Sequence, residues 1–99
     1  MSKIVMISYD LWVPETTQSY KDVISKIKSH ALSSVSPLKS VWLIKTDSSV
    51  SDIRDDLKYI TDVNDKILVI NITKPSGWRN RAWSRLSKDA SDWISLHMN

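Results

Sequence analysis

The chain contains no cysteine and only one glycine. Without cysteine there is no disulfide and no cysteine-based zinc site, as is common in proteins of a reducing cytosol. The single glycine, Gly77, is too little for a glycine-rich loop that cradles phosphates. Because there are only two histidines, His30 and His97, a zinc site built entirely from protein side chains is not expected either.

A long hydrophobic run is also missing. No apolar stretch approaches the ~20 residues that a membrane-spanning helix needs. The N-terminal residues show no small-residue cleavage pattern, so we expect no signal peptide. The hydrophobic fraction of 41% is ordinary for a globular chain. We therefore expect one cytoplasmic domain over residues 1–99, without a membrane partner.

Positive charge is concentrated in the last quarter of the chain. Residues 1–73 contain nine Lys or Arg and nine Asp or Glu, whereas residues 74–99 contain five basic and two acidic residues. The net charge of +3 therefore arises entirely in the C-terminal segment. A localised basic segment indicates either a polyanionic partner or a solvated loop and helix face.

A short apolar segment near the N-terminus, residues 3–9, ends on the carboxylate of Asp10. A near-continuous apolar run of this length predicts a β-strand buried on both faces. Ligands and chemistry gather at the carboxyl ends of central strands in α/β sheets. Asp10 is therefore the first candidate for a functional residue.

Two amphipathic helices are predicted from apolar residues at spacings of three and four. The first starts after Thr16 or Thr17, and its apolar side holds Tyr20, Val23, Ile24, Ile27 and Ala31. The second starts after Ser49, and its apolar side holds Val50, Ile53, Leu57 and Ile60. A short final helix is expected after Ser87, with a shared side formed by Ala90, Trp93, Ile94 and Leu96 or His97.

Three more strands are predicted between and after these helices. Residues 33–37 are polar and include Pro37, so we place them at a sheet edge. Residues 41–46 are β-branched, aromatic and apolar on both sides, which predicts an interior strand. Residues 67–72 form the most apolar run in the chain and are expected to be buried on both faces for most of their length.

The order of these elements predicts an α+β fold, a ferredoxin-like βαββαβ sandwich. Two right-handed crossovers on a four-stranded sheet place the first and third strands at the centre. Those strands, residues 3–9 and 41–46, are two of the three most apolar segments, which supports the assignment. The core then covers residues 3–73, and residues 74–99 form a Trp- and Arg-rich appendage that ends in a short helix.

Asp10 has two interpretations. A lone carboxylate at a strand end commonly accepts hydrogen bonds from backbone N–H groups of the following turn. The functional alternative is a ligand of Mg²⁺, which proteins hold with one or two carboxylates, waters and substrate phosphates. One Asp10 per chain is enough if a two-fold dimer pairs two copies, or if a nucleic acid supplies oxygens.

The basic segment combines aromatic and basic side chains, which suit stacked bases and backbone phosphates. The same residue types are enriched at protein–protein interfaces. A third alternative is that the tryptophans fold the appendage onto the sheet while the arginines stay in water. The candidate nucleic-acid-binding or partner-binding residues are Lys74, Trp78, Arg79, Arg81, Trp83 and Arg85.

Other polar residues give weaker signals. Asp55 and Asp56 are adjacent on a helix, where side chains point about 100° apart, so they are expected to form part of a solvated face rather than one site. His30 lies near a helix C-terminus, a position that usually favours a surface histidine. No serine lies in a motif that would pair it with an activating base.

The chain resembles the small proteins called SinR-like, which are distant relatives of the CRISPR-associated Cas-two family. The resemblance covers most of residues 3–94. The matching segments are ISYDL at 7–11, SVWLIKTD at 40–47, IRDDL at 53–57, NDKILVI at 64–70 and SDWI at 91–94.

This resemblance implies a ferredoxin-like homodimer that engages nucleic acid. In Cas-two nucleases the aspartate that ends the first strand is the metal-ligand position and lies at the dimer interface, a role that falls on Asp10 here. The implied activity is Mg²⁺-dependent hydrolysis of phosphodiesters in RNA or DNA. In CRISPR adaptation the same family acts mainly as a structural bridge that holds duplex DNA.

The alternative function is a non-catalytic protein–protein interaction module, or an inhibitor that acts on a nucleic-acid-handling defence complex. Two features favour it. The arginine-rich segment that usually follows the first strand of the family is replaced by residues 12–15, and the appendage is rich in Trp and Arg. A third alternative is a structural homodimer whose arginines bind nothing specific.

Overall fold

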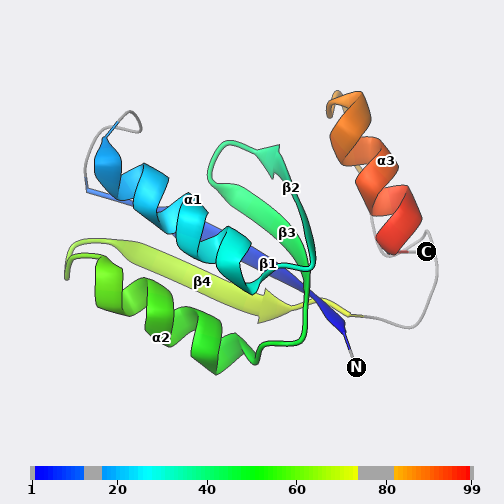
Figure 1. The fold of residues 1–99 in the computed structure, drawn as a ribbon. Helices are drawn as coiled ribbons and strands as arrows, with labels where there is room; N and C mark the ends of the chain where they lie inside the picture. Colours follow the sequence, from blue (N-terminus) through cyan, green and yellow to red (C-terminus); the bar gives the residue numbers. More distant parts are fainter. Residues whose placement is uncertain (1, 13–16, 74–81, 99) are drawn as a thin grey trace.

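The computed structural model describes residues 2–12, 17–73 and 82–98. It contains the predicted succession of strands and helices, followed by one further helix (Figure 1). The elements are β1 (Lys3–Asp10), α1 (Gln18–His30), β2 (Ser33–Leu38), β3 (Val41–Thr46), α2 (Val50–Ile60), β4 (Lys66–Asn71) and α3 (Lys88–His97). None of the described helices is long and apolar enough to cross a membrane.

The four strands form one antiparallel sheet in the order β2-β3-β1-β4. The first and third strands therefore lie at the centre, as the sequence predicts. The polar strand β2, which contains Pro37, lies at an edge where a residue without an N–H group is tolerated. The architecture is a small α+β fold, consistent with the ferredoxin-like plan.

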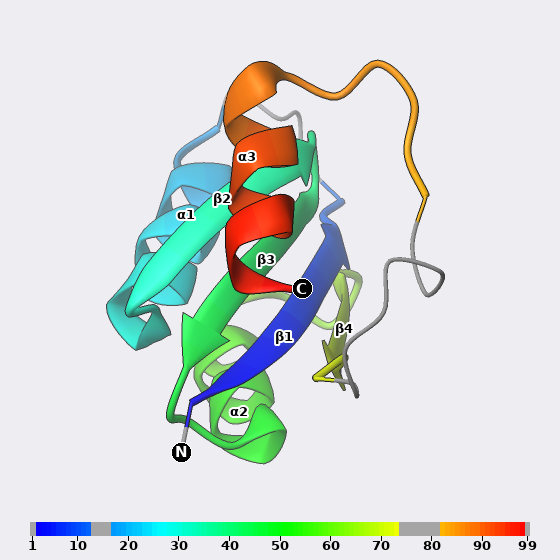
Figure 2. The same ribbon diagram turned by 90° about the vertical axis from the view of Figure 1, so that its right-hand side faces the viewer.

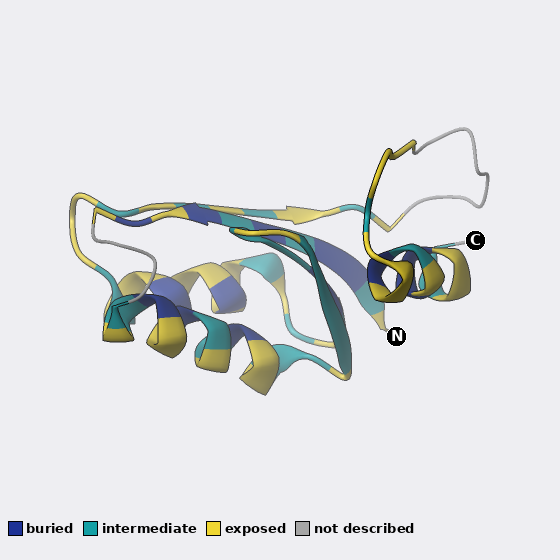
Figure 3. Cartoon of the chain, turned by 90° about the horizontal axis from the view of Figure 1, so that it is seen from above, coloured by how far each residue is buried: buried dark blue, intermediate teal, exposed yellow. Residues whose placement is uncertain are grey.

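Helices α1 and α2 cover one face of the sheet and enclose the main core (Figure 3). Strand β1 contributes Val5, Ile7 and Tyr9 to this face, since alternate side chains of a strand point the same way. The predicted buried stripes of both helices are confirmed at their centres, where these residues are buried: Tyr20, Val23, Ile27, Ile53 and Leu57.

Serine caps fix the starts of two helices. Ser49 Oγ accepts a hydrogen bond from the backbone N–H of Asp52 at 3.0 Å. Ser87 Oγ does the same for the N–H of Ala90 at 3.1 Å. Each bond satisfies one of the backbone donors that the first turn of a helix leaves unpaired. Both predicted helix starts are therefore confirmed.

Helix α3 covers part of the opposite face of the sheet and lies over β2 and β3 (Figure 2). A second apolar cluster joins α3 to the sheet through four buried residues: Ile4, Leu43, Trp93 and Ile94. The indole N–H of Trp93 also donates a hydrogen bond to Ser33 Oγ at 2.8 Å. The predicted shared side of α3 is correct for Ala90, Trp93 and Ile94, but Leu96 points to solvent.

The expectation that residues 67–72 are buried on both faces is wrong. Strand β4 is an edge strand, and Leu68 and Ile70 are 51% and 39% exposed. Ile67 and Val69 point the other way and pack against the main core. The reason is tertiary, because α3 covers the β2 side of this face and leaves the β4 side uncovered. The apolar content of a segment predicts that it forms a strand. It does not show which half of the sheet a later helix covers.

Candidate functional site

Asp10 is the last residue of β1 and is exposed. Its partner in the antiparallel ladder is Lys66, the first residue of β4. Among the described residues, Asp10 forms no ion pair and accepts no hydrogen bond at its carboxylate. The cap of the following turn is a different aspartate, since the Trp12 N–H donates to Asp65 Oδ1 at 2.7 Å. Within the described part of the chain, the Asp10 carboxylate is therefore not used as a loop cap.

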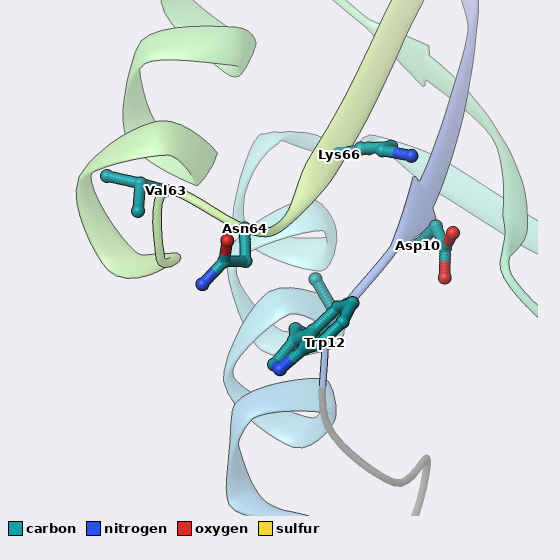
Figure 4. A pocket seen from close by; sticks show the side chains of 6 residues that line it. Asp10, Trp12, Val63, Asn64 and Lys66 are labelled. Atoms are coloured by element: carbon teal, nitrogen blue, oxygen red, sulfur yellow. The ribbon is translucent and has the colours of Figure 1, made fainter.

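A cavity of about 300 Å³ lies next to Asp10, between the end of β1 and the loop before β4 (Figure 4). Its walls come from Asp10, Leu11, Trp12, Val63, Asn64 and Lys66. Leu11 is buried beneath the cavity, whereas Trp12 is 77% exposed. In Figure 4 Asn64 and Trp12 lie on one side of the end of β1, and the Asp10 carboxylate points to the other side. We call this space the loop cavity.

A second, shallower hollow of about 180 Å³ adjoins Asp10 along the strands. It is lined by Ser8, Tyr9, Asp10, Lys66, Ile67 and Leu68. Asp10 and Lys66 therefore border both hollows and carry opposite charges at their shared rim. Leu68, which lines this hollow, is exposed, as is Ile70 two residues further along β4.

The described residues of one chain do not form a metal site by themselves. The described residues contain no group of three or more His, Cys, Asp or Glu side chains that could hold a metal ion. Asp65, in the loop before β4, already accepts hydrogen bonds from the N–H groups of Trp12 and Asp62. Among the described residues, Asp10 therefore has no second protein ligand with which to share a metal ion.

The appendage is described only in part. Lys74, Trp78, Arg79 and Arg81 lie outside the described residues. Trp83 and Arg85 are both exposed, and Arg85 adopts a left-handed backbone with φ of 62°. The exposure of Trp83 does not favour the alternative in which both tryptophans fold fully onto the sheet. Binding of nucleic acid or of a partner by this segment stays a prediction.

The structure also assembles three residues that the sequence patterns did not connect. His30 lies at the end of α1, Ser48 in the β3–α2 loop and Asp56 on α2. The Nδ1 atom of His30 is 2.8 Å from Ser48 Oγ, and its Nε2 atom is 2.7 Å from Asp56 Oδ2. The sequence offered one signal, since both His30 and Asp56 lie three residues after a buried isoleucine and so border the buried stripes.

A linked Ser, His and Asp are the components that activate serine nucleophiles in hydrolases. Catalysis also needs a substrate cleft and donors for an oxyanion. Ser48 does not line either hollow beside Asp10, and the remaining described cavities do not include it. We therefore interpret His30 as a cross-brace that ties the end of α1 to α2 and to the preceding loop.

Replacement of Asp56 by alanine is expected to lower the free energy of unfolding by about 1 kcal/mol. Hydrogen bonds to a charged partner contribute about 1.5–3 kcal/mol, and the 49% exposure of the Asp56 side chain reduces this through solvent screening. The matched control is Asp55→Ala, because Asp55 is exposed and pairs only with its neighbour Arg54. Urea unfolding should show a loss below about 0.5 kcal/mol for the control, and equal losses would refute the cross-brace.

Comparison with known proteins supports the fold. No family model matches the chain, and no curated protein matches it. Among solved structures, the crystal structure of a hypothetical protein TT1823 from Thermus thermophilus is similar, with a TM-score of 0.61. The two chains are 12% identical, and the match covers 88% of this chain and 96% of the other. At this identity the likeness shows the shared α+β fold alone.

Proposed function

We propose that this protein is a homodimer that engages nucleic acid, as the SinR-like and Cas-two-like resemblance implies. The observation that carries the proposal is the position of Asp10. This carboxylate is exposed at the end of a central strand, opposite Lys66, and it lies at the margin of a sheet face that α3 leaves uncovered. Such a place suits a residue that acts between two copies of the chain.

The uncovered part of the sheet supplies the dimer surface. We define the open face as Ser8, Asp10, Lys66, Leu68 and Ile70. Leu68 and Ile70 are its apolar centre, and covering their exposed area contributes about 1 kcal/mol each per copy. Exposed apolar side chains that gather on one surface commonly mark an interface.

The charges of the open face favour a second copy as the occupant. In a two-fold dimer the same surface patch meets itself, so the patch must be self-complementary. Asp10 and Lys66 face one another in the ladder and supply one charge of each sign at the same end of the face. Two copies related by a two-fold axis through this end bring two carboxylates together, with two ammonium groups that offset their repulsion.

Paired Asp10 carboxylates fit the ligand preference of Mg²⁺, which accepts one or two carboxylates together with phosphate oxygens. When bound, this ion supplies activation of water for phosphodiester hydrolysis. Asp10 would hold the ion from each copy, and Lys66 would attract the phosphate backbone. The same arrangement without hydrolysis would serve a structural role in holding nucleic acid.

The dimer is tested by placing charge on the open face. Leu68→Asp combined with Ile70→Asp is expected to convert a dimer into a monomer in size-exclusion chromatography with light scattering. The matched control is Leu32→Asp with Leu38→Asp, since these leucines are also exposed but lie near β2 at the other edge of the sheet. A wild-type monomer at high protein concentration, or dissociation of the control alone, would contradict the proposed interface.

The role of Asp10 is tested by Asp10→Ala, with Asp55→Ala as the control carboxylate. Single-stranded and duplex RNA and DNA are incubated with Mg²⁺, and cleavage is followed on gels. We expect cleavage by the wild type and the control, and at least a 100-fold slower reaction for Asp10→Ala. If the wild type binds nucleic acid without cleaving it, the structural role stands and the nuclease activity is refuted.

The second candidate function is a non-catalytic module that binds a protein of a nucleic-acid-handling complex. The observation that favours it is the outer edge of β4, which pairs with no described strand and carries exposed Leu68. Such an edge accepts an added strand from a partner. A wild type that stays monomeric and binds neither RNA nor DNA, but retains a host protein that Leu68→Asp releases, would favour this function.

A further inference from the structure

We propose that the loop cavity binds one unstacked base of a single-stranded nucleic acid, with the Trp12 indole as the stacking platform. This inference rests on the proposed function and specifies the form of nucleic acid that the protein engages. In this arrangement the backbone of the bound nucleic acid runs from the cavity toward Asp10.

The Trp12 side chain is exposed beside the loop cavity. A tryptophan that is 77% exposed leaves a large aromatic surface in water, which costs free energy unless a ligand covers it. Trp12 is also the aromatic residue beside the loop cavity, and its ring forms part of the wall. A stacked base would cover this ring, and every base offers an aromatic face for such a contact.

The backbone at Trp12 is held in place by hydrogen bonds. The Trp12 N–H donates to Asp65 Oδ1 at 2.7 Å, and the preceding Leu11 is buried, with its N–H directed at the Tyr20 hydroxyl at 3.4 Å. Asp65 also accepts from the N–H of Asp62 at 2.8 Å. One carboxylate thus ties both walls of the cavity together, so that binding requires little ordering of the backbone.

The rest of the cavity wall carries polar side chains that suit a nucleotide. Asn64 carries a carboxamide, which can donate and accept hydrogen bonds at a base edge. Its Nδ2 atom lies 3.4 Å from Asp62 Oδ1, a long contact that leaves the amide oxygen as an acceptor. Lys66 forms no ion pair with any described residue, so its ammonium group is available to a phosphate.

Asp10 determines how the backbone of the bound nucleic acid can run past the cavity. Its carboxylate repels phosphate, so a backbone close to Asp10 needs a cation between them. Under the proposed function that cation is Mg²⁺, and binding at the loop cavity is therefore expected to strengthen when Mg²⁺ is added. The base would lie on Trp12, and the adjoining phosphodiester would lie near Asp10.

The size of the cavity favours a single base over a helix. Its volume of about 300 Å³ is at the lower end of ligand pockets. A base inside a duplex has both faces covered by its neighbours and cannot stack on a side chain without leaving the helix. The loop cavity is therefore expected to select single strands, loops or frayed ends.

The experiment measures the binding of fluorescently labelled eight-nucleotide single strands of RNA and DNA by anisotropy, with Mg²⁺ and with EDTA. We expect Trp12→Ala to weaken binding by about 5- to 150-fold, the range for loss of one stacked base. Trp12→Phe keeps an aromatic face and should retain most of the affinity. Tyr59→Ala is the control, since Tyr59 is also an exposed aromatic residue, on α2, and its replacement should leave binding unchanged.

Two further measurements test whether binding is specific for single strands and whether Lys66 contacts a phosphate. A duplex of the same sequence should bind at least ten-fold more weakly than the single strand. Lys66→Gln should reduce the slope of log affinity against log salt by about one. Thermal unfolding of each variant checks that the fold is retained, which is expected because the Trp12 side chain is outside the core.

The possible failures of the two proposals are distinguishable. If the wild type binds single strands and Trp12→Ala binds them equally well, the loop cavity is refuted while the proposed function stands. If the duplex binds as tightly as the single strand, the single-strand assignment is refuted. If only a mononucleotide such as UMP binds, and Trp12→Ala abolishes it, the proposed function and the nucleic-acid assignment are both refuted.

Discussion

Replacement of Leu57 by alanine is expected to lower the free energy of unfolding by about 2–5 kcal/mol. Leu57 is fully buried on α2 and belongs to the main core cluster. Its truncation removes apolar contacts and leaves a cavity between α2 and the sheet. Because a domain of this size is stable by only about 5–15 kcal/mol, this single loss is a large fraction of the total. Urea unfolding followed by circular dichroism measures it.

The control is Leu96→Ala, which makes the same substitution in another helix. Leu96 is 76% exposed on α3, so the expected change is within about 0.5 kcal/mol. Comparison of the two variants separates burial from helix propensity, since both replace leucine by alanine within a helix. Similar losses for Leu57 and Leu96 would contradict the packing of α2 or the exposed side of α3.

Replacement of Trp93 by alanine is expected to release α3 from the sheet, with a loss of about 3–5 kcal/mol in the docking of that helix. Trp93 is buried in the second apolar cluster, donates a hydrogen bond to Ser33 Oγ at 2.8 Å and contacts the His97 ring at 4.5 Å between centroids. The main core lies on the other face of the sheet, so the effect should remain local.

Hydrogen exchange with mass spectrometry measures this release. Backbone amides of α3 should exchange rapidly in Trp93→Ala, while those of α1, α2 and the central strands stay protected. Trp93→Phe keeps most of the apolar contact and loses the N–H donor, so it should cost about 1 kcal/mol and leave α3 docked. Uniform loss of protection across the whole chain would show that α3 and the main core unfold as one unit.

The strands and helices themselves could be predicted from local patterns. Spacings of three and four marked α1 and α2, and serine caps marked the starts of α2 and α3. The central positions of β1 and β3 followed from the order of elements and the handedness of crossovers. These features are encoded within a few residues of each other along the chain, so the sequence alone reveals them.

The prediction for β4 was wrong for a reason that lies outside the segment. Residues 67–72 are more apolar than many buried strands, yet Leu68 and Ile70 remain exposed. Their environment depends on where α3 docks, and that is decided by contacts of Trp93 and Ile94 with distant residues. The excess apolar character of β4 then supports the proposed dimer, in which a second copy would supply the missing cover.

The candidate site, too, could be predicted from local sequence in one part and depended on tertiary packing in another. Asp10 could be selected from its place at the end of an apolar strand. The loop cavity could not, because Trp12 and Asn64 are more than fifty residues apart. Asp65 ties the Trp12 backbone to the loop that contains Asn64, since it accepts hydrogen bonds from the N–H groups of Trp12 and Asp62. Likewise, no local pattern links His30 to Asp56, which meet only because α1 and α2 lie side by side on the sheet.

By itself, the sequence determined the elements, their order, the central strands and the candidate carboxylate Asp10. It did so because periodicity, caps and turns act through neighbouring residues. The tertiary structure decided which half of the second sheet face α3 covers, and therefore that Leu68 and Ile70 of β4 stay exposed. It also decided that Trp12, Asn64 and Lys66 meet beside Asp10. Those outcomes depend on packing between distant segments, which local patterns do not report.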